Sequence, residues 1–192
     1  MSREHFYDAK EHPHLIKETL SIYEDSFPAS QREKSSNIEK NIANGTYKMC
    51  IYLLDEEVLG FYILDIQPQL DYTLLTFLAI KAAKRGIGLG SKLSLKATEL
   101  FKEELQSKYF LIEAQERQAK LYEKFGFEKI AIEYSAPSFD SEQSIPMELM
   151  KLKGSADIDK VSLSKIIEDI FTRGYSLNKN DARIEQQLSK IG

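Results

Sequence analysis

Apolar residues recur along the chain with two different periods, and the changes of period predict the order of its elements. Apolar positions three or four residues apart indicate a helix over 12–27, which Pro28 ends. A shorter helix is expected from Ser35 or Ser36 to Asn44-Gly45, because serine caps a helix start and glycine a helix end. Runs rich in β-branched and aromatic residues then predict three strands, over 47–54, 58–66 and 72–80.

The remainder of the chain alternates between helical and extended patterns. It predicts a helix over about 88–107, a strand over 109–114, a short helix over 119–124 and two strands over 127–134 and 145–152. This order predicts a mixed α+β fold with one sheet flanked by helices. After Gly154 the pattern is helical only, with apolar stripes over 159–173 and 181–191.

We therefore expect one domain over 1–153 and a helical C-terminal extension over 154–192. The apolar stripe of an amphipathic helix must be covered by something. The stripe of this extension either packs on its own domain or joins two copies of the chain in a homodimer.

Composition narrows the class of protein. The 192 residues include 42% hydrophobic residues and carry a net charge of −4, a balance typical of a globular domain and without the basic character that nucleic acid favours. The longest apolar stretch, near 74–80, is too short to span a bilayer, and the polar N-terminus lacks the apolar core of a signal peptide. The single cysteine, Cys50, cannot form an intramolecular disulfide. These features predict a soluble cytoplasmic protein that binds neither nucleic acid nor membranes.

Candidate chemistry is concentrated in a glycine-rich loop between a predicted strand and a predicted helix, KRGIGLGS over 84–91. Glycines let other groups approach the backbone, and a helix start offers unpaired N–H groups and a positive dipole end, so the loop suits a phosphate-containing ligand. A P-loop requires lysine and then serine or threonine after its last glycine, whereas Ser91-Lys92 has the reverse order. A dinucleotide loop matches better, since the pattern is G-x-G-x-x-S and Glu113 follows where a ribose-binding acid is expected.

Two blocks together resemble the Gcn5-related N-acetyltransferase (GNAT) superfamily. Arg85-x-x-Gly88-x-Gly90 is similar to its acetyl-CoA loop, and residues 119–127, AKLYEKFGF, are similar to its signature that ends in L-Y-x-K-x-G-F. The predicted element order also matches, so the resemblance covers about the first four-fifths of the chain, through Leu152. It implies a mixed, mostly antiparallel central sheet that splays between the fourth and fifth strands of the family fold, near Ile80 and Ala114.

The resemblance also implies acetyl-CoA as co-substrate and assigns residues to it. The backbone of Leu78 and Ile80 would pair with the pantetheine arm, and Tyr122 would direct its hydroxyl at the sulfur. The loop would hold the pyrophosphate through the backbone N–H groups of Arg85, Gly86, Ile87, Gly88, Leu89, Gly90 and Ser91. Relatives often carry a cofactor-binding asparagine at the position of Glu116, and this chain departs from them there.

Acetyl transfer to an amine requires a proton acceptor and a proton donor. An alkyl ammonium group has a pKa of about 10.4, so a base or a water chain must remove a proton before the nitrogen attacks. Glu113, at the strand end beside the expected splay, is the candidate base, with an ordered water as the alternative. Tyr122 is the candidate general acid. No metal is expected, because His5, His12 and His14 lack partners at metal-ligand spacing.

We expect an N-acetyltransferase that moves an acetyl group from acetyl-CoA to a primary amine by direct attack, without a covalent enzyme intermediate. The acceptor would be a small-molecule amine or a peptide. The alternative is a non-catalytic acyl-CoA-binding or regulatory module with the same fold.

Overall fold

An eight-stranded sheet lies at the centre of the computed structural model, which describes residues 3–192. Its strands are β1 (Glu4–Asp8), β2 (Tyr47–Leu54), β3 (Glu57–Gln67), β4 (Tyr72–Ile80), β5 (Tyr109–Ala114), β6 (Phe127–Lys129), β7 (Tyr134–Pro137) and β8 (Ser144–Leu152). They lie in the order β1-β2-β3-β4-β5-β8-β6, with β7 also paired to β8, and only the β4–β5 pair is parallel. The mixed α+β fold with a mostly antiparallel sheet is confirmed. This topology excludes the doubly wound parallel sheet of a dinucleotide-binding fold.

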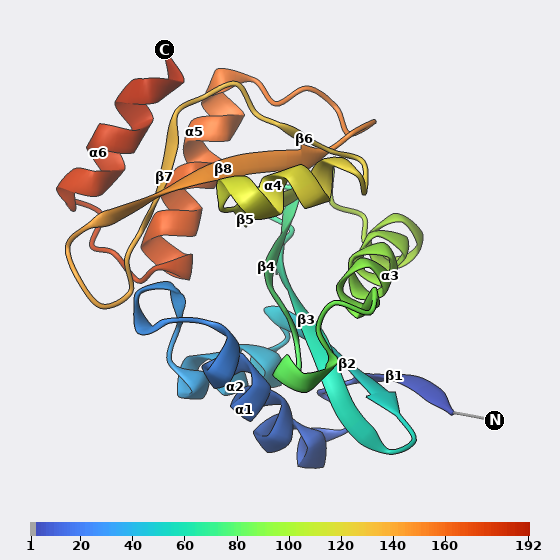
Figure 1. Ribbon diagram of the computed structural model, residues 1–192. Coiled ribbons are helices and arrows are strands. Elements are labelled where there is room, and N and C mark those ends of the chain that lie inside the picture. The colour runs from blue at the N-terminus through green and yellow to red at the C-terminus, as the bar shows by residue number, and fades with distance from the viewer. Residues whose placement is uncertain (1–2) are drawn as a thin grey trace.

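Helices cover both faces of the sheet (Figure 1). They are α1 (Ile16–Ser26), α2 (Ser35–Asn44), α3 (Leu89–Glu104), α4 (Glu116–Glu123), α5 (Lys160–Asp169) and α6 (Ala182–Leu188). One face packs against α3 and α4, through a cluster that includes Leu93 and Ala119. The other face packs against α1 and α2 over β2 and β3, and against α5 and α6 over β4, β5 and β7. Within residues 3–192, no helix is both long enough and apolar enough to cross a membrane.

The parallel strands β4 and β5 pair only along their first halves. Their register ends where Leu75 faces Ile112, and the strands then separate. A bulge follows at once, since Thr76 has no partner in the register between β4 and β3. From Thr76 to Ile80, β4 is paired with β3 alone, which leaves its other backbone edge open. The expected splay between these two strands is therefore present.

The bulge also changes which side chains of β4 face which side of the sheet. Side chains alternate along a strand, so one extra residue shifts the alternation by one. Leu74 before the bulge and Phe77 after it consequently lie on the same face, the one covered by α1 and α5.

Gly60 of β3 allows the end of β4 to approach closely. A Cβ atom at this position would lie 2.6 Å from the Ile80 side chain and 2.7 Å from the backbone oxygen of Ala79. These distances are shorter than any van der Waals contact allows, so only glycine fits there without displacing β4. Gly60 thus allows the close packing of Ile80, the last residue of β4, against β3.

The C-terminal extension packs against the sheet of its own chain. The apolar stripe of α5, including Leu163 and Ile166, is buried with side chains of β4, β5 and β7. The Asp159 side chain caps this helix by accepting from the Ser162 N–H, and a π-helical turn, Ile170–Gly174, follows its end. The stripe is thus covered within the chain. A homodimer through these helices stays a prediction and would have to use their outer surfaces.

Two strands differ from the sequence-based expectation. The edge strand β1, paired with β2, lies in an N-terminal segment whose pattern predicts no strand. The single strand expected over 127–134 is wrong, because β6 and β7 pair with successive parts of β8. Lys129 of β6 pairs with Met150, and Tyr134 of β7 pairs with Met147. The segment that joins β6 to β7 is therefore two residues longer than the part of β8 opposite it, and the chain kinks over 130–133 to accommodate the extra residues.

Candidate active site

A cavity of about 400 Å³ opens where β4 and β5 separate. Its lining comes from both faces of the sheet. Tyr122 and Ala114 belong to the layer under α3 and α4. Glu113 and Tyr175 face the opposite layer, under α1, α2 and α5. The cavity therefore crosses the sheet through the splay, and a ligand on one face can reach a ligand on the other.

The end of β4, which is predicted to bind the pantetheine arm, and Tyr122 both line this cavity. Leu78 and Ile80 of β4 both line it, opposite Ile112 and Ala114 of β5. Tyr122, from α4, lines the cavity on the α3 side and packs edge-on against the Phe127 ring at a centroid distance of 5.8 Å. Burial raises the pKa of Tyr122 to about 12, so its hydroxyl stays protonated at neutral pH.

The glycine-rich loop lies at the start of α3 and presents unpaired backbone N–H groups. Gly86 and Gly88 have φ angles of +83° and +89°, a left-handed conformation that other residues rarely adopt. Within residues 3–192, no acceptor is found for the N–H groups from Gly86 to Ser91, and the first helical bond here runs from the Lys92 N–H to the Gly88 oxygen. The space around the loop glycines is open. This arrangement can hold an anion.

Arg85 differs from the rest of the loop. Its N–H donates to the Ala82 oxygen at 3.3 Å, so that backbone donor is already used. Its guanidinium donates to the Ile80 oxygen at 3.0 Å and to the Ser26 hydroxyl at 2.9 Å. The side chain therefore joins the end of β4 to the end of α1 and lines the cavity. The backbone of Gly86 through Ser91 lies outside that lining.

Glu113 is enclosed by two tyrosines from distant parts of the chain. One carboxylate oxygen accepts a hydrogen bond from the Tyr134 hydroxyl, and the other accepts from the Tyr175 hydroxyl at 3.0 Å. Glu113 is half-buried, and it lines the cavity. Burial raises the pKa of Glu113 to about 7, and the two tyrosine hydrogen bonds act in the opposite direction. A carboxyl group with this pKa can accept a proton near neutral pH.

Two loops line the cavity on the Glu113 face. The Phe139 N–H donates to the Ser30 oxygen at 2.8 Å, which ties the β7–β8 loop to the segment between α1 and α2. Aromatic rings form much of the wall. The ring centroids of Phe27 and Phe77 are 5.2 Å apart, and those of Phe139 and Tyr175 are 4.6 Å apart. This end of the cavity is therefore apolar along its sides.

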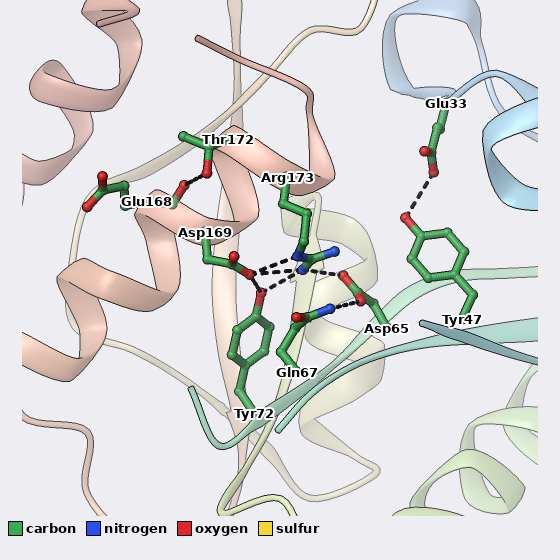
Figure 2. Close-up of polar contacts among 9 residues, drawn as sticks. All are labelled: Glu33, Tyr47, Asp65, Gln67, Tyr72, Glu168, Asp169, Thr172 and Arg173. Atoms are coloured by element: carbon green, nitrogen blue, oxygen red, sulfur yellow. Dashed lines mark hydrogen bonds and ion pairs between the residues drawn. The ribbon is translucent and has the colours of Figure 1, made fainter. Parts of the chain in front are cut away.

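A network of charged side chains reaches the cavity on this face through Asp65, and its hydrogen bonds are drawn in Figure 2. Asp65, which is 1% exposed, accepts from the Arg173 guanidinium at 2.7 Å. Arg173 also donates to Asp169 at 3.1 and 3.0 Å and to the Tyr72 hydroxyl at 3.0 Å. Arg173 lies in the π-helical turn, so this network joins the C-terminal extension to β3 and β4. Glu33, which also lines the cavity, accepts from the Tyr47 hydroxyl at 2.9 Å.

The structure brings together five of the residues singled out in the sequence and separates others. They are Leu78, Ile80, Arg85, Glu113 and Tyr122, which all line the cavity. Glu116 does not: it lies exposed at the start of α4 and pairs with Lys120.

The two tyrosines that bind Glu113 carry no signal in the sequence, because Tyr134 and Tyr175 are 21 and 62 positions away from it. For the connection between α1 and α2 that contains Glu33, the family resemblance leaves two interpretations, part of the acceptor pocket or a plain helix connection. In the structure Glu33 lines the cavity.

Comparison with known proteins agrees with this fold. The family described as acetyltransferase (GNAT) domain matches residues 16–150. No curated protein matches the chain in sequence. A GNAT-family protein of Bacteroides thetaiotaomicron is 17% identical and covers 92% of this chain and 99% of its own, with a TM-score of 0.70. The uncovered part of this chain is about 15 residues, fewer than 154–192 contains, so part of the extension has a counterpart there.

Two further structures share the fold at a lower score. The ribosomal-protein-S18-alanine N-acetyltransferase of Escherichia coli is 18% identical, covers 83% of this chain and 97% of its own, and has a TM-score of 0.57. The catalytic domain of the Tetrahymena Gcn5 histone acetyltransferase, solved with coenzyme A, is 18% identical, covers 79% and 92%, and has a TM-score of 0.54.

Proposed function

Because the chain belongs to the GNAT acetyltransferase family, we propose that it transfers an acetyl group from acetyl-CoA to a primary amine of a small molecule or peptide. The observation that carries the proposal is the cavity through the β4–β5 splay. It places Tyr122 on one face of the sheet and Glu113 on the other, with the open edge of β4 between them. A donor and an acceptor on opposite faces would meet there.

The residues on the α3 face fit acetyl-CoA. The unpaired N–H groups from Gly86 to Ser91, at the start of α3, would hold the pyrophosphate. The free edge of β4 near Leu78 and Ile80 would bind the amide groups of the pantetheine arm. The bound donor supplies an activated acetyl thioester. The Ile80 N–H is the candidate donor to the carbonyl oxygen as negative charge develops on it.

Glu113 is the proposed base. The attacking nitrogen forms a bond to the acetyl carbon and gives up a proton, either to the Glu113 carboxylate directly or through a water molecule. Tyr134 and Tyr175 orient the carboxylate by donating to both of its oxygens. With a pKa of about 7, Glu113 is largely ionised above neutral pH and can take that proton.

Tyr122 is the proposed acid for the leaving sulfur. Full proton transfer from a hydroxyl of pKa about 12 to a thiolate whose conjugate acid has a pKa near 8.5 is uphill by about 5 kcal/mol. We therefore propose that the Tyr122 hydroxyl first donates a hydrogen bond to the sulfur as the carbon–sulfur bond breaks. The proton follows as the thiol forms.

Ligand binding and turnover test this function separately. Acetyl-CoA and coenzyme A should raise the melting temperature, and NAD should not, because binding to the folded state stabilises it. Release of free thiol should then depend on an added amine. A melting temperature unmoved by either CoA species at saturating concentration would overturn the proposal.

A Tyr122→Phe variant separates the enzyme from a non-catalytic binding module. The variant should lose about a hundredfold in kcat while its melting temperature still rises with acetyl-CoA. Tyr7→Phe, on β1 and outside the cavity lining, is the matched control and should keep wild-type turnover. Acetyl-CoA binding without turnover on any amine, in wild type and variant alike, would support the binding module instead.

A further inference from the structure

Glu33 is a buried carboxylate that faces the cavity without a cationic partner. It is 6% exposed and lies between α1 and α2. One of its oxygens accepts from the Tyr47 hydroxyl at 2.9 Å, as Figure 2 shows. Among the ion pairs of residues 3–192, none includes Glu33. Burial raises the pKa of Glu33 to about 6, and the Tyr47 hydrogen bond opposes that rise, so the group is still ionised at pH 7.5.

The arginines closest to this end of the cavity contact other groups. Arg173 pairs with Asp65 and Asp169. Arg85 donates to backbone and hydroxyl oxygens at the end of β4 and α1. Arg32, next to Glu33 in sequence, donates to the Glu24 backbone oxygen at 2.7 Å. Within the part of the chain that the structure describes, Glu33 therefore forms no ion pair, although the charge of Arg173 lowers the pKa of Glu33 from a distance.

A buried ionised carboxylate is normally paired, because removing it from water is costly. A carboxylate that is left unpaired and that opens onto a cavity is therefore suited to a cationic group of a ligand. Glu113, on the same face, is a second carboxylate without an ion pair, hydrogen-bonded only to tyrosines. The cavity thus offers two separate negative positions.

The aromatic part of the cavity lining on this face is suited to an alkyl chain. Phe27, Phe77, Phe139 and Tyr175 line it with aromatic carbon. Aromatic rings also attract cations over their faces. Glu33 contacts a tyrosine of β2, whereas Glu113 belongs to β5, so the two carboxylates enter the cavity from elements on opposite sides of the β3–β4 pair.

We propose that the acceptor carries two positively charged nitrogens joined by an extended alkyl spacer. One nitrogen is acetylated beside Glu113, and the other stays charged and binds the Glu33 carboxylate. This proposal rests on the proposed function, since it names the acceptor class of the same cavity. It makes Glu33 a specificity-determining residue that takes no part in the chemistry.

Initial rates on a matched series of amines test the proposal. Wild-type protein is assayed for thiol release with terminal diamines of increasing length and with the monoamine of each length. We expect kcat/KM for the best diamine to exceed that of its monoamine at least about tenfold. Glu33→Gln should remove most of this preference by raising KM for the diamine, and should change KM for the monoamine less than about twofold. Activity on the monoamine also shows that the variant is folded.

Glu39→Gln is the matched control, because it removes an exposed carboxylate from the adjacent helix and should leave the preference intact. Equal kcat/KM for diamines and monoamines in the wild type would overturn the proposal. A diamine preference that survives in Glu33→Gln would overturn the role of Glu33.

A binding measurement separates this proposal from the proposed function. Calorimetry of diamine and monoamine in the presence of coenzyme A requires no turnover. If the diamine binds in a Glu33-dependent manner but is not acetylated, the class of ligand is confirmed and the proposed acetyltransferase function is refuted. Equal or absent binding of both amines would overturn the acceptor class.

Discussion

A Glu113→Gln substitution should change how the stability of the protein depends on pH. The pKa of the Glu113 carboxyl is raised by burial from 4.5 to about 7, so the folded protein binds this proton more tightly than the unfolded chain does. The sign follows directly. The contribution of Glu113 to stability is fully present below pH 4.5 and is lost as the pH rises through about 7.

The size of this effect follows from the two pKa values. Each unit of difference corresponds to about 1.36 kcal/mol, and most of the 2.5-unit difference is traversed between pH 5 and pH 8.5. Through this group alone, the wild type should lose about 2.5 kcal/mol of unfolding free energy over that range. Glutamine has nearly the same shape and does not ionise, so the variant should lack this loss.

Urea denaturation followed by circular dichroism at both pH values is a suitable assay, since the chain has no tryptophan. The difference in unfolding free energy between variant and wild type should move by about 2.5 kcal/mol in favour of the variant from pH 5 to pH 8.5. Glu33, whose pKa is also raised, is present in both proteins and cancels in the difference. Glu116→Gln, which removes an exposed carboxylate, should run parallel to wild type. If Glu113→Gln also runs parallel, the carboxyl is not desolvated and its role as a base near neutral pH loses its basis.

Three further substitutions test other parts of the structure. Tyr175→Phe removes a hydrogen bond that lowers the pKa of the carboxyl group it contacts, so the pH–rate profile should move to higher pH; an unchanged profile would refute this positioning role. Gly60→Ala places a Cβ 2.6 Å from a side-chain atom of β4 and should cost about 1–3 kcal/mol in urea denaturation, whereas Gly90→Ala, with no atom within 4 Å, should be nearly neutral. Arg173→Met leaves a buried carboxylate unpaired and should cost about 3–5 kcal/mol, most of which Asp65→Asn in the same chain should restore; a double variant as unstable as the single one would contradict the pairing.

Most elements of the fold could be predicted because their signals are local. The α2 helix begins at Ser35 and ends before Gly45, which has a φ angle of +84°, as its sequence suggests. The expected serine cap is wrong, because Lys34 is the N-cap residue and no side chain caps the helix start. The strand pattern fails where pairing decides the outcome. β1 is an edge strand that forms because β2 offers it a partner, and no alternation within five residues reveals that. The kink over 130–133 likewise exists because one long strand, β8, must pair with two short ones.

The site residues likewise fall into those with a local sequence signal and those that only tertiary packing brings together. The glycine-rich loop and the block around Tyr122 are contiguous in sequence, so their pattern could be matched to a family. Glu113 is identifiable by its place at a strand end. Its tyrosine partners are not, since tertiary packing alone brings Tyr175 from the C-terminal extension to β5. Glu33 is similar: nothing in its local sequence indicates that a residue in a helix connection is 6% exposed.

The passage of the cavity through the sheet has a consequence for the order of events in turnover. A cavity that is lined from both faces of the sheet lets the proposed donor and acceptor approach from opposite sides, so that neither has to wait for the other. Initial-rate plots for such an enzyme should give intersecting lines, and neither substrate should have to bind first. A long acceptor can then extend away from the α1 face while coenzyme A departs from the α3 face. The free space on one side of the sheet, and not the size of the reaction centre, limits how large an acceptor can be.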